Sequence, residues 1–277
     1  MNIEQILSME PMGADRYIAS SPSGTGRTDI FGGQVAGQAL RAGSLTVAST
    51  KVPNSIHSYF LRRGRPDLPL EIRVERVRDG RTYANRRIQV IQDGKVIFEM
   101  AASFHSDEPG REVSVPMPSD VADPDELVSA ERVMALPFEI RNVDEPAPGV
   151  RWWGRFPGPM SDDPFIRCSA LLYASDMRAG GAAITAIGFE DGPDAFADGS
   201  GPPKNFGSLD HSLWFHQVPT LDDWFFCDVR PVAVRDSRGL VFGKIYERSG
   251  RQLASFVQEM FLKVFEGEPI ALDDGRG

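Results

Sequence analysis

Two segments, HSYFLRRG at residues 57–64 and HSLWFHQV at residues 211–218, decide how this chain folds, because they resemble one another across half of the sequence. Two further pairs of similar segments follow in the same order and at nearly the same separation. They are RDGRTY at 78–83 with RDSRGL at 235–240, and IQDGKVIFEMAASF at 91–104 with ERSGRQLASFVQEM at 247–260. Self-similarity at a near-constant separation is typical of a repeated structural unit. The chain is therefore predicted to contain two tandem copies of one unit.

Each copy begins with a pattern that is typical of an amphipathic helix. In the first copy, Phe31, Val35 and Ala39 recur every four residues beside a pair of glycines, the spacing of one helix face. In the second copy, one stripe starts at Phe165 and ends at Asp176. It follows a proline, a residue that suits the first helical turn. We expect one helix before the strands of each copy.

Four strands are predicted after each helix. Short turns with Asp-Gly and Ser-Gly signals separate them, as in antiparallel hairpins. The expected strands are 56–63, 69–78, 82–91 and 95–105 in the first copy, and 208–217, 223–233, 239–247 and 252–265 in the second. An antiparallel sheet wrapped over one central helix, present twice with the two sheets joined edge to edge, is an α+β arrangement.

The repeat also predicts the organisation of the chain. We expect a first unit at 1–106, a connector at 107–137 and a second unit at 138–277. The connector is rich in Asp, Glu and Pro, with one short helix expected around 122–136. An insertion at 188–205 is rich in Gly, Pro and Asp, which favours a loop that borders a site.

Composition excludes several classes of protein. The 277 residues are 41% hydrophobic and 25% charged, the balance of a globular protein. A net charge of -9 disfavours a nucleic-acid partner, because that affinity comes largely from neutralising phosphates. Two cysteines make no disulfide framework and favour a reducing cytoplasm. We expect no signal peptide and no membrane span, since no apolar run approaches about 20 residues.

Two polar residues break the symmetry of the repeat. On the apolar face of the last strand, Gln258 stands where the first copy has Ala102. A buried amide without a partner costs about 1–3 kcal/mol, so Gln258 is expected to bond a site residue, a neighbouring backbone group or water. Asp176 lies on an apolar helix stripe, where a carboxylate must be paired or stand at the mouth of a cavity. A capping role and a catalytic role both remain open for it.

The strand at 208–216 has polar residues on both faces. By alternation along the strand, Ser208 is expected on the face of Asp210 and Trp214. His211 and His216 are expected on opposite faces, so they cannot share a metal ion, and no metal site is predicted. Asp210 is interpreted as a structural residue, although an Asp210–His211 catalytic pair is an alternative.

Taken together, these segments resemble the acyl-CoA thioesterase II family over nearly the whole chain. The resemblance rests on IFGGQVAGQAL at 30–40, HSYFLRRG at 57–64, VERVRDGR at 74–81, YASD at 173–176, SLDHSLWFH at 208–216 and ASFVQEMFL at 254–262. It implies a double hotdog fold and hydrolysis of fatty acyl-CoA. It also implies that Asp176, Ser208 and Gln258 match the family's catalytic Asp, hydroxyl residue and Gln, which activate a water. The insertion departs from the family pattern and leaves the shape of the acyl tunnel open.

The residue types suggest how this chemistry proceeds. Asp176 is the expected base for water, and Ser208 and Gln258 can orient that water through their donor and acceptor atoms. Backbone N–H groups at Gly32, Gly33 and Gln34 are candidates for binding the substrate oxyanion, because a helix N-terminus presents unpaired donors. Close packing of the helix on the sheet is the alternative explanation of the glycines. No cofactor is expected.

Two other functions remain as alternatives. A hydratase or dehydratase of the hotdog fold would need an Asp and a His in a loop such as G-D-x-N-P-x-H, which the sequence lacks. A non-catalytic acyl-CoA binding protein would not require the Asp, Ser and Gln set. Self-association into a homo-oligomer is expected from exposed sheet edges and aromatic residues.

Overall fold

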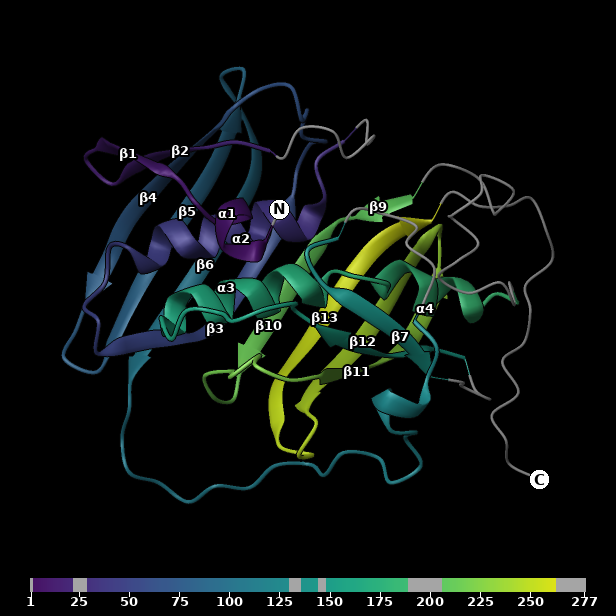
Figure 1. The fold of residues 1–277 in the computed structure, drawn as a ribbon. Helices are drawn as coiled ribbons and strands as arrows, with labels where there is room; N and C mark the ends of the chain where they lie inside the picture. Colours follow the sequence, from purple (N-terminus) through teal and green to yellow (C-terminus); the bar gives the residue numbers. More distant parts are fainter. Residues whose placement is uncertain (1, 22–28, 130–135, 144–147, 189–205, 263–277) are drawn as a thin grey trace.

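The computed structural model describes residues 2–21, 29–129, 136–143, 148–188 and 206–262. Within them, thirteen antiparallel strands form a single sheet with the order β1-β2-β4-β5-β6-β3-β10-β13-β12-β11-β8-β7, and β9 pairs with β13. Helices α2 and α3 lie side by side against the sheet (Figure 1). Each half thus contributes one of these two helices, as the repeat predicts.

The first half contains the expected helix and four strands. Its elements are α1 (Ile3–Ile6), β1 (Glu10–Gly13), β2 (Arg16–Ala19), α2 (Gly32–Ser44), β3 (Lys51–Phe60), β4 (Leu70–Asp79), β5 (Tyr83–Gln92) and β6 (Lys95–Ser106). On β6, alternate residues from Phe98 to Phe104 are buried, because successive side chains of a strand point to opposite faces. The sequence patterns missed α1, β1 and β2, which are each only four residues long.

The second half has more strands than expected. Its elements are β7 (Glu139–Val143), β8 (Val150–Arg155), α3 (Pro164–Ser175), α4 (Ala179–Thr185), β9 (Phe206–Ser208), β10 (Asp210–Phe215), β11 (Phe225–Arg235), β12 (Arg238–Glu247) and β13 (Gln252–Leu262). Strand β8 escaped prediction because Trp152 and Trp153 are both buried, on opposite faces. A strand buried on both faces lacks the alternation that marks a strand in sequence.

Part of the predicted connector and the insertion lie outside the described residues. Around the expected helix at 122–136, a 3₁₀ turn η1 covers Pro124–Glu126, and 130–135 are not described. Residues 189–205 of the insertion and 263–265 of the expected last strand are likewise outside the described residues. The division into two units and a connector stays a prediction.

The two halves join where β3 pairs with β10, so the expected edge-to-edge joint is confirmed. In this pairing His57 lies opposite Ser212, and Ser58 lies opposite His211. His57 is exposed, whereas the side chain of His211 is fully buried. The two His-Ser pairs that align in sequence therefore face opposite ways. Residues of the two strands that share a face are therefore one position apart in the sequence alignment.

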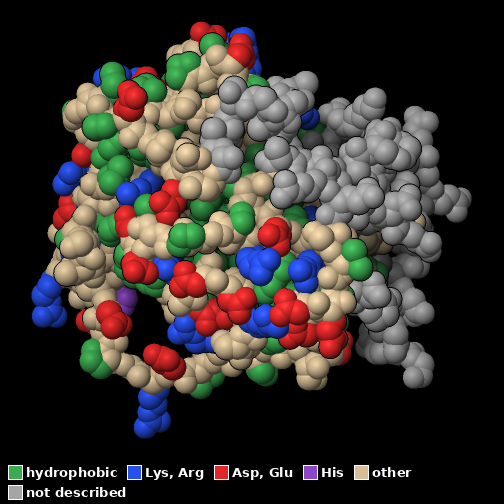
Figure 2. All heavy atoms as spheres, viewed as in Figure 1, with side chains coloured by type: hydrophobic (Ala, Val, Ile, Leu, Met, Phe, Trp, Pro, Cys, Tyr) green, Lys and Arg blue, Asp and Glu red, His purple; other side chains and the backbone are tan. Residues whose placement is uncertain are grey.

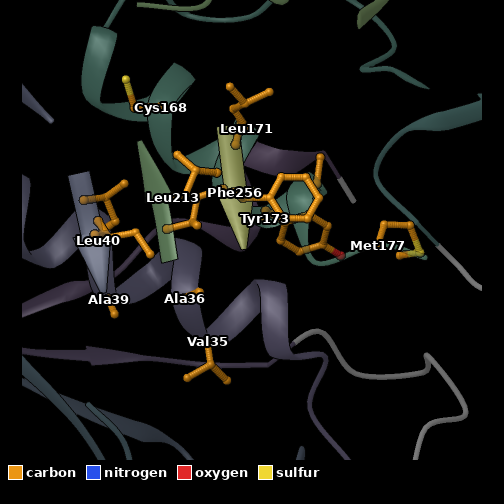
Figure 3. Packing of buried hydrophobic residues seen from close by; sticks show 14 of the residues in the cluster. Val35, Ala36, Ala39, Leu40, Cys168, Leu171, Tyr173, Met177, Leu213 and Phe256 are labelled. Carbon is orange, nitrogen blue, oxygen red and sulfur yellow. The ribbon is translucent and has the colours of Figure 1, made fainter. Parts of the chain in front are cut away.

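Helices α2 and α3 approach each other closely because glycine lines the contact. A Cβ at Gly33 would clash with the backbone oxygen of Tyr173, and one at Gly37 would lie 3.0 Å from the backbone oxygen of Ser169. Figure 3 shows side chains of both helices gathered in one cluster with Leu213 of β10 and Phe256 of β13. This approach brings the start of α2 to the end of α3.

Charged side chains of both signs are interspersed on the surface (Figure 2). Residues 62–87 are rich in arginine. Several of these arginines form ion pairs, including Arg76 with Asp15 and Arg73 with Glu71, both at 2.7 Å. In the described part of the chain, a membrane-crossing helix of sufficient length and hydrophobicity is absent.

Candidate active site

Three side chains from distant parts of the chain meet at the end of α3. The Nε2 atom of Gln258 donates to Asp176 Oδ1 at 2.6 Å and to Ser208 Oγ at 2.7 Å. The hydroxyl of Ser208 donates to the same Oδ1 at 3.2 Å. The residues that were expected to form one group therefore lie within hydrogen-bonding distance of one another.

Asp176 occupies a position that is unfavourable for a carboxylate by helix electrostatics alone. It is the C-cap residue of α3, and the C-terminus of a helix carries a partial negative charge. The carboxylate faces the start of α2 instead, since a Cβ at Gly32 would lie only 2.7 Å from Oδ2. The positive end of α2 and the donors from Gln258 and Ser208 favour the negative charge that α3 disfavours.

The backbone donors at the start of α2 differ in their availability. The N–H of Gln34 donates to Phe31 O at 3.0 Å, so it is already used in the first turn, and its side chain bonds Ser21. Gly32 and Gly33 are the first two residues of the helix, where N–H groups have no partner within the helix. Only these two therefore remain as candidate oxyanion donors. The alternative explanation, close packing on the sheet, fits only Gly32, which lies near Phe60 of β3, whereas Gly33 lies against the backbone of α3.

Ser208 faces inward for a reason that the sequence pattern did not reveal. It pairs with Met260 on β13, whereas Ser212, four residues later, pairs with Val257, only three residues earlier. One extra residue on the β9–β10 side is a β-bulge, which re-aims side chains. The prediction that Ser208 shares the face of Asp210 is wrong. Ser208 and His211 both point to Gln258 instead.

The sequence suggests a role for His211 only as a partner of Asp210, but in the structure it contacts Gln258 instead. Its Nδ1 lies 3.0 Å from Gln258 Oε1, and its Nε2 lies 2.8 Å from Ser175 Oγ. Burial lowers the pKa of His211 to about 4, so the ring is neutral at neutral pH. His211 lies on the same buried face of β10 as Leu213 and Phe215, so alternation along the strand could have placed it inside.

Asp210 points away from this group. Its Oδ1 accepts from the backbone N–H of Glu259 at 3.0 Å, and partial burial raises the pKa of its carboxyl. This contact agrees with its interpretation as a structural residue. Among the described residues, no three His, Cys, Asp or Glu side chains are grouped so that they could hold a metal ion.

Comparison with known proteins identifies both halves. The model of the acyl-CoA thioesterase N-terminal domain matches residues 20–105, and that of the C-terminal domain matches residues 109–262. The chain is 30% identical to acyl-coenzyme A thioesterase 8 of Mus musculus, over 95% of the chain and 89% of that protein.

Solved structures agree with this match. An acyl-CoA thioesterase II from Mycobacterium marinum is 31% identical, with a TM-score of 0.80 over 98% of this chain and 100% of the other. A protein with a hot dog fold from Alicyclobacillus acidocaldarius has a TM-score of 0.77 at 16% identity, over 95% of this chain and 98% of its own. That second likeness concerns the fold alone. The expected double hotdog architecture is confirmed.

Proposed function

The chain belongs to the acyl-CoA thioesterase family, and from this premise we propose that Asp176, Ser208 and Gln258 form its catalytic site. The protein is an acyl-CoA hydrolase that converts fatty acyl-CoA to free fatty acid and CoA. The single observation that supports the site is the convergence of these three side chains, from α3, β9 and β13, within 3.2 Å of one another.

In the proposed mechanism, Asp176 acts as the general base. It takes a proton from a water molecule as the water oxygen attacks the carbonyl carbon of the thioester. Ser208 lies beside the carboxylate and orients this water through its hydroxyl. Gln258 donates to both groups, so its amide holds the base and the hydroxyl in one arrangement.

The oxyanion that forms on the thioester carbonyl needs donors that are in place before reaction. We assign this role to the N–H groups of Gly32 and Gly33. They stand at the positive end of α2, the end that faces the Asp176 carboxylate. When the tetrahedral intermediate collapses, the carbon–sulfur bond breaks, and the proton held by Asp176 goes to the leaving sulfur. The products are a fatty acid and the CoA thiol.

Thiol release from acyl-CoA by the Asp176→Asn variant tests the proposal. The substitution keeps the size of the side chain and removes the base, so kcat should fall roughly 100- to 10,000-fold. Asp210→Asn is the matched control, because an amide oxygen can still accept from Glu259 N–H, and it should stay active. Full activity of Asp176→Asn in the folded protein would refute the assignment.

We also propose that the chain works in a reducing compartment such as the cytoplasm and that it self-associates. Cys168 and Cys227 are both free and buried, as expected where disulfides do not form. Tyr59 and Trp214 are exposed large aromatic side chains on the two central strands. Light scattering at micromolar concentration should give a mass above 30.5 kDa, and a strictly monomeric protein would contradict this.

A further inference from the structure

The hydrogen-bonded group extends beyond the three proposed catalytic residues. The Oε1 atom of Gln258 faces Nδ1 of His211, and Nε2 of the same ring faces the hydroxyl of Ser175. These three side chains are almost completely buried, so water does not replace the contacts easily. Ser175 immediately precedes Asp176, and the chain of contacts therefore begins and ends at the C-terminus of α3.

The chemistry of the amide decides which way Gln258 must point. An amide has one accepting oxygen and one donating nitrogen. With Nε2 toward Asp176 and Ser208, both of its protons are used. The reversed amide would set its oxygen against the carboxylate oxygen, two acceptors without a proton between them. The functional orientation therefore needs a donor for Oε1 on the opposite side.

Resting on the function proposed above, we propose that His211 is a positioning residue. Its neutral ring, protonated at Nδ1, donates to Gln258 Oε1 and thereby holds the amide with both N–H groups toward the base and the hydroxyl. His211 does not touch the reacting atoms. It acts on the reaction through Gln258.

Gln258 Oε1 determines the tautomer of the ring, and the hydroxyl of Ser175 can support it. This hydroxyl lies 2.8 Å from His211 Nε2 and 2.9 Å from the backbone oxygen of Leu172, and it has a single proton to donate. Because Gln258 Oε1 can only accept, the ring proton lies on Nδ1, and the Ser175 hydroxyl then donates to Nε2 instead of to Leu172 O. Because burial lowers the pKa of His211, the ring stays neutral at the pH where the enzyme would be assayed.

Two substitutions at His211 separate positioning from packing. His211→Leu removes the donor, so kcat should fall about 10- to 100-fold, as for loss of supporting partners in other sites, with KM little changed. His211→Asn places an amide N–H near the position of Nδ1 and should recover most of the lost kcat. His216→Leu is the matched control, because His216 is on the same segment, its ring contacts the hydroxyl of Ser255 rather than the site, and its loss should leave kcat unchanged.

The tautomer provides a readout that packing alone would not produce. The chain has four histidines, so ¹⁵N-histidine NMR spectra are simple, and the His211 signals are those missing in His211→Asn. We expect a proton on Nδ1 and none on Nε2 at pH 7. Ser175→Ala should increase the population of the other tautomer and lower kcat, without removing a large buried side chain.

The outcomes distinguish this inference from the proposed function. If Asp176→Asn is inactive but His211→Leu keeps the wild-type kcat, only the positioning role is wrong. Equal losses in folded His211→Leu and His211→Asn would overturn it too, as would a ring protonated at Nε2. If Asp176→Asn is fully active, the proposed catalytic site is wrong, and the tautomer still shows whether His211 donates to Gln258. If His211→Leu does not fold, the NMR spectrum and Ser175→Ala decide.

Discussion

Replacing Gly32 with Ala should impair catalysis without unfolding the protein. The new Cβ would lie 2.7 Å from Asp176 Oδ2 and 3.0 Å from Phe60 Cε1. Ordinary van der Waals contact begins at 3.4 Å, so the carboxylate and the methyl group must separate by about 0.7 Å. Asp176 is the side chain that must yield, since Gly32 belongs to a helix held by its neighbours.

A displacement of this size is enough to disturb the site. The contact between Gln258 Nε2 and Asp176 Oδ1 is 2.6 Å, and it would lengthen toward the limit of a hydrogen bond. Because misplacement of a reacting group by about 1 Å can cost 100-fold in rate, we expect kcat to fall roughly 10- to 100-fold. Stability should change little, because Ala is a better helix former than Gly by up to about 1 kcal/mol.

The assay is thiol release from a fatty acyl-CoA, combined with urea unfolding of each variant. Gly43→Ala in the same helix is the matched control. Its Cβ would meet only side chains, with Ile88 Cδ1 at 3.1 Å the nearest, at the opposite end of α2 from the site. It should keep the wild-type kcat. A Gly32→Ala enzyme with unchanged kcat, or one slowed no more than the control, would refute the argument.

Three further predictions concern stability and reactivity. Burial lowers the pKa of His211 from 6.5 to about 4, so in this interval the unfolded chain binds a proton that the folded chain does not. The resulting stabilisation, about 3 kcal/mol, is fully present above pH 6.5 and is lost as the pH falls toward 4. Between pH 7.5 and pH 5, the free energy of unfolding measured in urea should therefore fall less in His211→Asn than in wild type. Burial also raises the pKa of Cys168 and Cys227. Both thiols should therefore resist a thiol reagent at pH 8 and react only after unfolding. Rapid labelling of the folded protein would contradict this. Arg86 is buried and donates to the side-chain and backbone oxygens of Thr46. Arg86→Met should therefore lower the free energy of unfolding by about 2–4 kcal/mol. It should leave kcat intact, because the far end of α2 is about 20 Å from its start. Equal unfolding midpoints for wild type and Arg86→Met would contradict the last expectation.

Patterns that depend on nearby residues were readable from the sequence. The start of α2, the proline at the start of α3 and the inward face of β13 all follow from spacings within one element. The polar break at Gln258 was visible because the neighbouring positions on its face are apolar. The resemblance of whole motifs to a known family then brought Asp176, Ser208 and Gln258 together as a set.

Features that depend on packing between elements could not be predicted from the sequence. The bulge before β10 turns Ser208 inward, and no residue in that segment marks the extra position. His57 and His211 also lie on opposite faces of the sheet, although their segments align in sequence. Strand β8 was hidden because it is buried on both faces.

The duplication, the central helices and the residue types available for hydrolysis follow from the order of the amino acids alone, because hydrophobic periodicity and repetition are properties of the chain. The tertiary structure alone decided that Gly32 meets the Asp176 carboxylate and that His211 meets Gln258. Both contacts join residues far apart in the chain, and their geometry depends on the approach of two helices and on the pairing of β10 with β13. Such distances are outcomes of the packing of the whole molecule.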